Sequence, residues 1–130
     1  MTAEEKEIII TLSKAIKGRN LVKINYDGEN RIVEPYLIGE LYDKHSNDMK
    51  EGVYALRAWF VSGYSSQNLD IRAGDRWRIY HIKKIHKLEI LEEENHTIRP
   101  FYNMYDKNFK RINFHVVDKT SSSEDGNEQC

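Results

Sequence analysis

The sequence predicts a mainly β fold with one N-terminal helix: a small barrel of about five strands, followed by a C-terminal extension. Two observations lead to this prediction. Apolar residues recur at helical spacing only near the N-terminus, and the rest of the chain reads as short strands separated by turn residues at hairpin spacing. The chain of 130 residues is long enough for one compact domain but not for two with separate cores. We expect a barrel because closure removes exposed sheet edges.

The predicted helix occupies residues 1–18. Thr2 and Glu5 have the spacing of a capping box, in which two side chains satisfy backbone N–H groups at the start of a helix. Gly18 marks the end of the helix, because glycine tolerates the backbone conformation that terminates helices. The apolar stripe that should face the sheet consists of Ile8, Ile9, Leu12, Ala15 and Ile16.

Residues 20–42 predict a hairpin of two strands. Asp27-Gly28 is a turn pair that accepts positive φ, and Pro35 marks an edge or a bulge in the second strand. The polar segment 43–52 predicts a loop before a strand at 53–64, and residues 65–75 predict a second loop.

Residues 74–91, GDRWRIYHIKKIHKLEIL, predict two further strands and a tight turn. Ile82, Ile85 and Leu88 are three residues apart, and one flat strand cannot place residues at that spacing on the same face. We therefore expect a turn at Lys83-Lys84, with the basic residues of this stretch gathered around it.

The C-terminal part of the chain divides into two segments. Residues 96–118 are rich in aromatic residues and end in an alternating pattern, which predicts a packed extension that closes with a short strand. Residues 119–130 are polar and predict a disordered tail. The barrel itself should therefore span residues 19–95. Its predicted core is Val22, Ile24, Val33, Leu37, Leu56, Ala58, Ile82, Ile85, Leu88 and Ile90.

The charge is balanced overall but segregated along the chain. Twenty Lys and Arg residues against 21 Asp and Glu give a net charge of −1, which excludes a strongly basic protein of the kind that wraps duplex nucleic acid. Residues 71–87 are nonetheless strongly basic, whereas residues 89–94 and 124–128 are acidic. The sequence therefore predicts a local basic patch.

Signals of catalysis, metal binding and export are weak. The five histidines are scattered without a zinc spacing, and the only cysteine, Cys130, is the last residue. The sequence has neither a Gly-x-Ser-x-Gly motif nor a glycine-rich phosphate loop. We expect a protein with no catalytic activity, no metal and no cofactor. We also expect it in the cytoplasm and away from membranes, because no signal peptide or long apolar stretch is visible.

Three segments in this order, INYDGENRIVEPYLI, VYALRAW and WRIYHIKKI, resemble the WYL domain family. The family pattern runs from a Tyr through Arg-x-x-Glu-Pro to a Trp-Tyr-Leu strand and then Arg-x-Phe-x-Leu-Asp-Arg-Ile. Its matches here are Tyr26, Arg31, Glu34, Pro35, Tyr54, Leu56, Arg78, Tyr80, Ile82, Lys84 and Ile85, within residues 8–91. The chain departs from the pattern where Val53 or Tyr54 replaces the Trp, Tyr80 the Phe, Lys83 the Asp and Lys84 the last Arg. LRAWFVSGYS and RPFYNMYD are similar to short, stand-alone WYL-like proteins.

The resemblance implies an Sm-like or SH3-like barrel that senses a nucleic acid or nucleotide-like anion, as in bacterial and phage regulators of transcription. Only one helix precedes the first predicted strand, so we do not expect this chain to read DNA through the winged helix-turn-helix of most WYL-containing regulators. Arginine offers a planar fork of donors for phosphate, and tyrosine offers a ring face for a base. The predicted ligand-binding residues, at the barrel mouth, are Arg31, Arg57, Ser65, Arg78, Tyr80 and Lys84.

A second interpretation is a structural or protein-interaction module without a small-ligand site. Exposed Arg and Lys on strands more often solvate a surface or pair with a carboxylate than bind a ligand. We expect Glu34 to pair with an arginine and not to act as an acid or base. The possible partners are thus single-stranded nucleic acid or a nucleotide, a regulatory protein, or a second copy that pairs along the edge strand 112–116.

Overall fold

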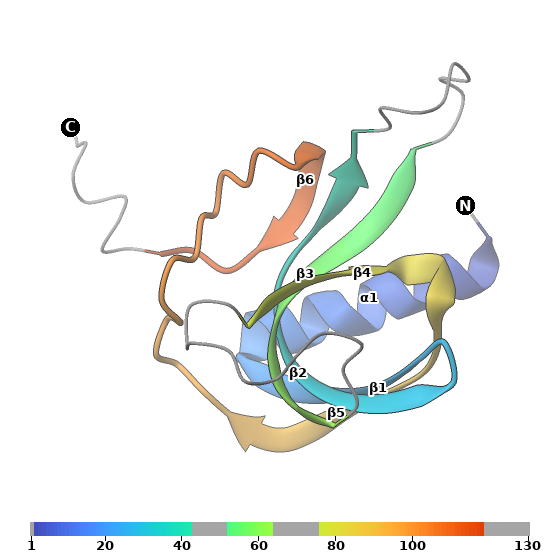
Figure 1. Ribbon diagram of the computed structural model, residues 1–130, viewed down its shortest axis with the longest axis horizontal. Coiled ribbons are helices and arrows are strands. Elements are labelled where there is room, and N and C mark those ends of the chain that lie inside the picture. The colour runs from blue at the N-terminus through green and yellow to red at the C-terminus, as the bar shows by residue number, and fades with distance from the viewer. Residues whose placement is uncertain (1, 43–51, 64–75, 119–130) are drawn as a thin grey trace.

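The computed structural model describes residues 2–42, 52–63 and 76–118. The predicted loop at 65–75, nearly all of the loop at 43–52, and the predicted disordered tail lie outside the described residues, as does Ser65. The described elements, shown in Figure 1, are the helix α1 (Ala3–Gly18), the strands β1 (Asn20–Tyr26), β2 (Glu29–Leu41), β3 (Val53–Gly63), β4 (Trp77–His81), β5 (Ile85–Glu94) and β6 (Phe109–His115), and the short 3-10 helix η2 (Ile82–Lys84).

The strands form one antiparallel sheet of six strands in the order β4-β3-β2-β1-β5, with β6 paired to β2 beside this path. The long β2 makes this branching possible, because its first half pairs with β1 and its second half with β6 (Figure 1). Within the described residues no ladder joins β4 to β5, so the sheet is open. The structure confirms a mainly β fold with one N-terminal helix, whereas closure into a barrel is not observed.

The helix α1 begins and ends as its sequence predicts. Thr2 accepts a bond from the Glu5 N–H, and the Glu5 side chain accepts one from the Thr2 N–H, which completes the capping box. Gly18 is the last helical residue, but the left-handed cap is Arg19, with φ of 59°. The helix packs against β1, β2 and β5. Its buried residues are Ile9, Leu12, Ala15 and Ile16.

Two predicted features of the first hairpin are confirmed. Asp27 and Gly28 both have positive φ, 53° and 87°, as a two-residue type I′ turn requires. The register of β2 against β3 shifts between Pro35 and Leu37, so the proline lies at a bulge. The residues of β2 before this bulge pair with β1, and those after it pair with β6.

The predicted turn at Lys83-Lys84 is confirmed as η2. Ile82 and Ile85 at its two ends are buried, while both lysines are exposed. Because β4 pairs with β3 and β5 pairs with β1, this turn carries the chain from one end of the sheet to the other.

The predicted core is confirmed at eight positions. Leu88 is only partly buried and Ile90 is 37% exposed, so the prediction for Ile90 was wrong. Both residues lie on β5, an end strand of the sheet path, where one side of the strand has no neighbour to complete the burial. The confirmed core residues are Val22, Ile24, Val33, Leu37, Leu56, Ala58, Ile82 and Ile85.

The C-terminal segment packs on the sheet and ends in a strand, as predicted. Met104, Phe109 and Val116 are buried, and the Tyr102 hydroxyl donates a 2.7 Å bond to the carbonyl of Val116. Among the described residues, no helix has the length and apolar character that crossing a membrane requires.

Candidate anion-binding site

The alternation of β4 places Arg78 and Tyr80 on the same face of the sheet. In the pairing with β3, Arg78 lies opposite Ala58 and Tyr80 lies opposite Leu56, both core residues. Tyr80 is itself buried, with 2% of its surface exposed. A basic side chain and a phenol are therefore held side by side at the boundary of the core.

Arg31 on β2 joins this pair by stacking on aromatic rings. Its guanidinium carbon lies 5.0 Å from the centroid of the Tyr26 ring and 5.7 Å from that of Tyr80. The two rings meet edge to face, with centroids 5.0 Å apart. Arg31 is 9% exposed, so the cation–π attraction acts with little competition from water. We call Tyr26, Arg31, Arg78 and Tyr80 the tyrosine–arginine cluster.

Both arginines affect the pKa of the Tyr80 hydroxyl. Burial raises the pKa of Tyr80 above its usual value, and the positive charges of Arg31 and Arg78 act in the opposite direction. The guanidinium groups of Arg31 on β2 and Arg78 on β4 therefore both act on one phenol.

The turn η2 adds positive charge at the edge of the cluster. The backbone N–H of His81 donates a 3.0 Å bond to the Tyr26 hydroxyl, which ties the end of β4 to β1. Burial lowers the pKa of His81, and the charges of Lys84 and Lys83 lower it further. The Lys84 ammonium lies 3.9 Å from the Asp27 carboxylate, and both groups are exposed.

The predicted site residues are thus only partly brought together. Arg31, Arg78 and Tyr80 converge, and Lys84 lies at the neighbouring turn. Arg57 does not join them, because it lies opposite Ile79 and so faces the other side of the sheet. Its Nε donates a 2.8 Å bond to Asp106 in the C-terminal segment. Arg31 and Tyr80 are both buried, so Tyr80 offers no open ring face on which a base could stack.

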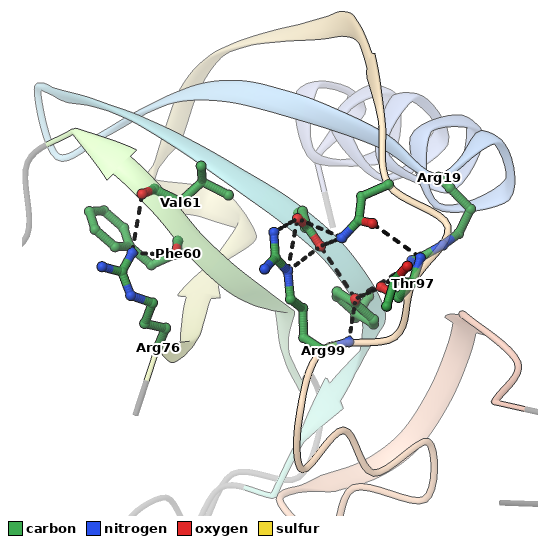
Figure 2. Close-up of polar contacts among 9 residues, drawn as sticks. Arg19, Phe60, Val61, Arg76, Thr97 and Arg99 are labelled. Atoms are coloured by element: carbon green, nitrogen blue, oxygen red, sulfur yellow. Dashed lines mark hydrogen bonds and ion pairs between the residues drawn. The ribbon is translucent and has the colours of Figure 1, made fainter. Parts of the chain in front are cut away.

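A second group of charges surrounds Glu34, which is 3% exposed. Its carboxylate accepts bonds from Arg99 Nε at 3.0 Å, from the Arg99 Nη2 and from Asn95 Nδ2 at 3.1 Å, as Figure 2 shows. The Arg99 guanidinium also lies over the Trp59 ring, 5.2 Å from its centroid. The predicted pairing of Glu34 with an arginine is confirmed. Its partner, Arg99, is 65 residues away in sequence. The one local signal near Arg99 is the proline that follows it, Pro100, and this does not identify Glu34 as the partner.

Tyr36 extends this group toward the helix. Its hydroxyl accepts a 3.0 Å bond from the backbone N–H of Arg99 and a 3.2 Å bond from Arg19, whose guanidinium lies over the Tyr36 ring (Figure 2). Burial raises the pKa of Tyr36, opposed first by the bond from Arg19. We call Arg19, Glu34, Tyr36, Asn95, Thr97 and Arg99 the Glu34 network.

Arg76, just before β4, contacts the backbone of β3. Its Nη1 donates to the carbonyl oxygens of Phe60 at 3.3 Å and Val61 at 3.2 Å, which extends the contact between β3 and the start of β4 (Figure 2). In the part of the chain that the structure describes, no three His, Cys, Asp or Glu side chains are grouped closely enough to hold a metal ion.

Comparisons of the chain with family models, with curated proteins and with solved structures gave no match. The resemblance to the WYL domain therefore rests on the residue pattern alone and stays a prediction.

Proposed function

We propose that this protein is a non-catalytic regulatory module that senses a nucleotide-like anion or a short single-stranded nucleic acid. The observation that carries the proposal is the convergence of Arg31 and Arg78 on Tyr80. Arg31 lies on β2 and Arg78 on β4, the two strands that flank β3, and a phosphate accepts bonds from several donors at once.

The ligand would approach from the turn side of the cluster. Arg78 is partly exposed and the Lys84 side chain is 45% exposed, so these two can make first contact with an anion. Arg31 lies behind them, held against the rings of Tyr26 and Tyr80. In this arrangement Tyr80 positions the cations and does not stack on a base. Ser65 stays a predicted phosphate contact.

The strand order also supports the WYL-like interpretation of the fold. Five consecutive strands in the order β4-β3-β2-β1-β5, with a 3-10 helix between β4 and β5, are the elements from which an Sm-like or SH3-like barrel is built. We propose that the sheet, in which no ladder joins β4 to β5 within the described residues, forms a partly open barrel of this kind, with the tyrosine–arginine cluster at its mouth.

Binding of labelled nucleotides and short single-stranded oligonucleotides tests the proposal. Arg78→Ala should remove a bidentate phosphate contact and weaken binding by about 1 to 3 kcal/mol without loss of the fold. Arg111→Ala is the matched control, because it removes the same charge from an exposed side chain on β6. Equal losses from both variants would indicate diffuse attraction to a charged surface and would contradict a defined site.

Exposed apolar residues at the C-terminal end of β6 favour the second candidate, a protein-interaction module. Phe114 is 42% exposed and Val117 is 55% exposed. The dependence of binding affinity on salt concentration distinguishes the two functions. Phosphate contacts release counterions, so nucleic-acid binding should weaken steeply as salt rises, whereas a partner held by apolar contacts should be much less sensitive.

A further inference from the structure

A groove of about 980 Å³ lies between the C-terminal half of α1, residues 96–98 and the end of β6. It is separate from the tyrosine–arginine cluster, since none of the four cluster residues lines it. Its volume is at the upper end of the range typical of ligand sites. The groove is partly open to solvent, which suits a peptide better than a small molecule that needs an enclosed cavity.

Apolar side chains form much of the groove. Ile16 and Val116 are buried at its base, and Ile98 is partly buried beside them. Phe114 and Val117 keep 42% and 55% of their surface exposed, so a bound segment could remove apolar area from water at these two residues. An exposed apolar surface of this kind is a typical feature of an interaction site.

Positive charge surrounds this apolar surface. Lys14 and Lys17 are exposed on α1, and in the described part of the chain neither has an ion-pair partner. Arg19 also lines the groove, although it belongs to the Glu34 network. Asp118 is the one carboxylate among the lining residues that the structure describes, and it is 9% exposed. The groove is therefore apolar at its base and cationic at its rim.

We propose that this groove binds a peptide segment of a partner protein in which apolar residues are flanked by Asp and Glu. Two nearer alternatives fit the groove less well, one because of its charge and the other because of its composition. Two copies facing each other through this groove would bring Lys14 and Lys17 of both into opposition. The chain's own segment 119–130 is acidic, but apart from Cys130 it has no apolar side chain to fill the base.

Selection of short random peptides displayed on phage against the full chain tests this proposal. The peptides recovered should combine Leu, Ile or Phe with Asp and Glu. Phe114→Ser should lower their affinity roughly tenfold, and Lys14→Gln with Lys17→Gln should lower it about fivefold, with the larger loss at low salt. Lys87→Gln on β5 is the matched control and should change affinity by less than about twofold.

Three results would overturn the proposal. The first is that no peptide is enriched over an unrelated protein of similar charge. The second is that the enriched peptides bind wild type, Phe114→Ser and the double lysine variant equally well. The third is that the wild type self-associates and Phe114→Ser abolishes that association without a change in peptide binding, which would make this face an interface between copies. Amide chemical shifts of Phe114 and Val117 locate the peptide even if a variant fails to fold.

Discussion

The tyrosine–arginine cluster and the Glu34 network use arginine in opposite ways. In the Glu34 network, the guanidinium of Arg99 meets a carboxylate whose side chain is 4% exposed, so the two charges neutralise each other locally. In the tyrosine–arginine cluster, the guanidinium of Arg31 lies over the rings of Tyr26 and Tyr80. Stacking engages the flat face of a guanidinium, whereas the pair of Arg99 with Glu34 engages its N–H edge.

The difference separates a structural site from a candidate binding site. The Glu34 network joins β2 to residues 95–99 and thereby fixes the path of the chain after β5. In the tyrosine–arginine cluster, Arg31 and Arg78 instead act on the hydroxyl of Tyr80 and oppose the rise that burial causes in its pKa.

Arg99→Ala should cost about 3 kcal/mol of unfolding free energy, because it leaves the buried Glu34 carboxylate with only neutral hydrogen-bond donors. Urea denaturation measures the loss. The control is Arg111→Ala. Arg111 is exposed and its contact with the buried Glu40 is long, at 3.9 Å, and Lys110 still pairs with Glu40, so this variant should cost no more than about 1 kcal/mol. Equal costs for the two variants would mean that the Glu34 network does not stabilise the fold more than this long ion pair does.

Tyr36→Phe should destabilise the protein by about 1 to 2 kcal/mol, because the variant removes the hydroxyl that accepts bonds from Arg19 and from the Arg99 N–H and leaves both donors partly buried. Thermal unfolding monitored by circular dichroism gives the difference. The matched variant is Tyr102→Phe, which removes one hydroxyl bonded to the Val116 carbonyl and should cost less. The reverse order would place the main constraint on the C-terminal segment at Tyr102.

Arg31→Met should destabilise the protein by about 1 kcal/mol, because methionine retains much of the buried side-chain volume while the cation–π attraction and the side-chain hydrogen bond to Tyr80 are lost. Oligonucleotide binding should nevertheless fall roughly tenfold, as expected for loss of one charged contact. This split between stability and binding is what distinguishes the tyrosine–arginine cluster from the Glu34 network. A large loss of stability together with unchanged binding would assign Arg31 a purely structural role.

Local patterns were enough to predict most of the fold. The capping box, the Asp27-Gly28 turn and the turn at Lys83-Lys84 each depend on residues close together in sequence, and all three are confirmed. The separate strand β6 was expected as a short closing strand, but its pairing with the second half of β2 depends on the bulge after Pro35 and could not be read from spacing.

The candidate site was harder to predict because it depends on which face of a strand each side chain occupies. Arg57 was grouped with Arg78 since their strands are neighbours, but the register pairs Arg57 with Ile79. The ion pair of Arg57 with Asp106 and that of Glu34 with Arg99 both join residues far apart in sequence. No local signal identified these partners, so the number of arginines committed to carboxylates was underestimated.

The smallest effect concerns His81, at the edge of the tyrosine–arginine cluster. Its pKa is lowered by burial and by Lys84 and Lys83, so below pH of about 6.5 the unfolded chain takes up a proton that the folded chain does not. Stability should therefore decrease as pH falls below this value and level off once the pH is under the pKa of the folded state. Urea unfolding at pH 7.5 and 5.5 tests this, and His81→Gln should weaken the dependence.

A bound anion should reverse this shift, because negative charge beside Lys84 favours the protonated imidazole. The nuclear magnetic resonance titration of His81 should accordingly move to higher pH when an oligonucleotide is added, while the ring signals of His115, which lines the separate groove beside α1, stay in place. If the His115 signals shift and those of His81 do not, the anion binds in the groove. In that case the arginines of the tyrosine–arginine cluster have a structural role only, and the contrast with the Glu34 network disappears.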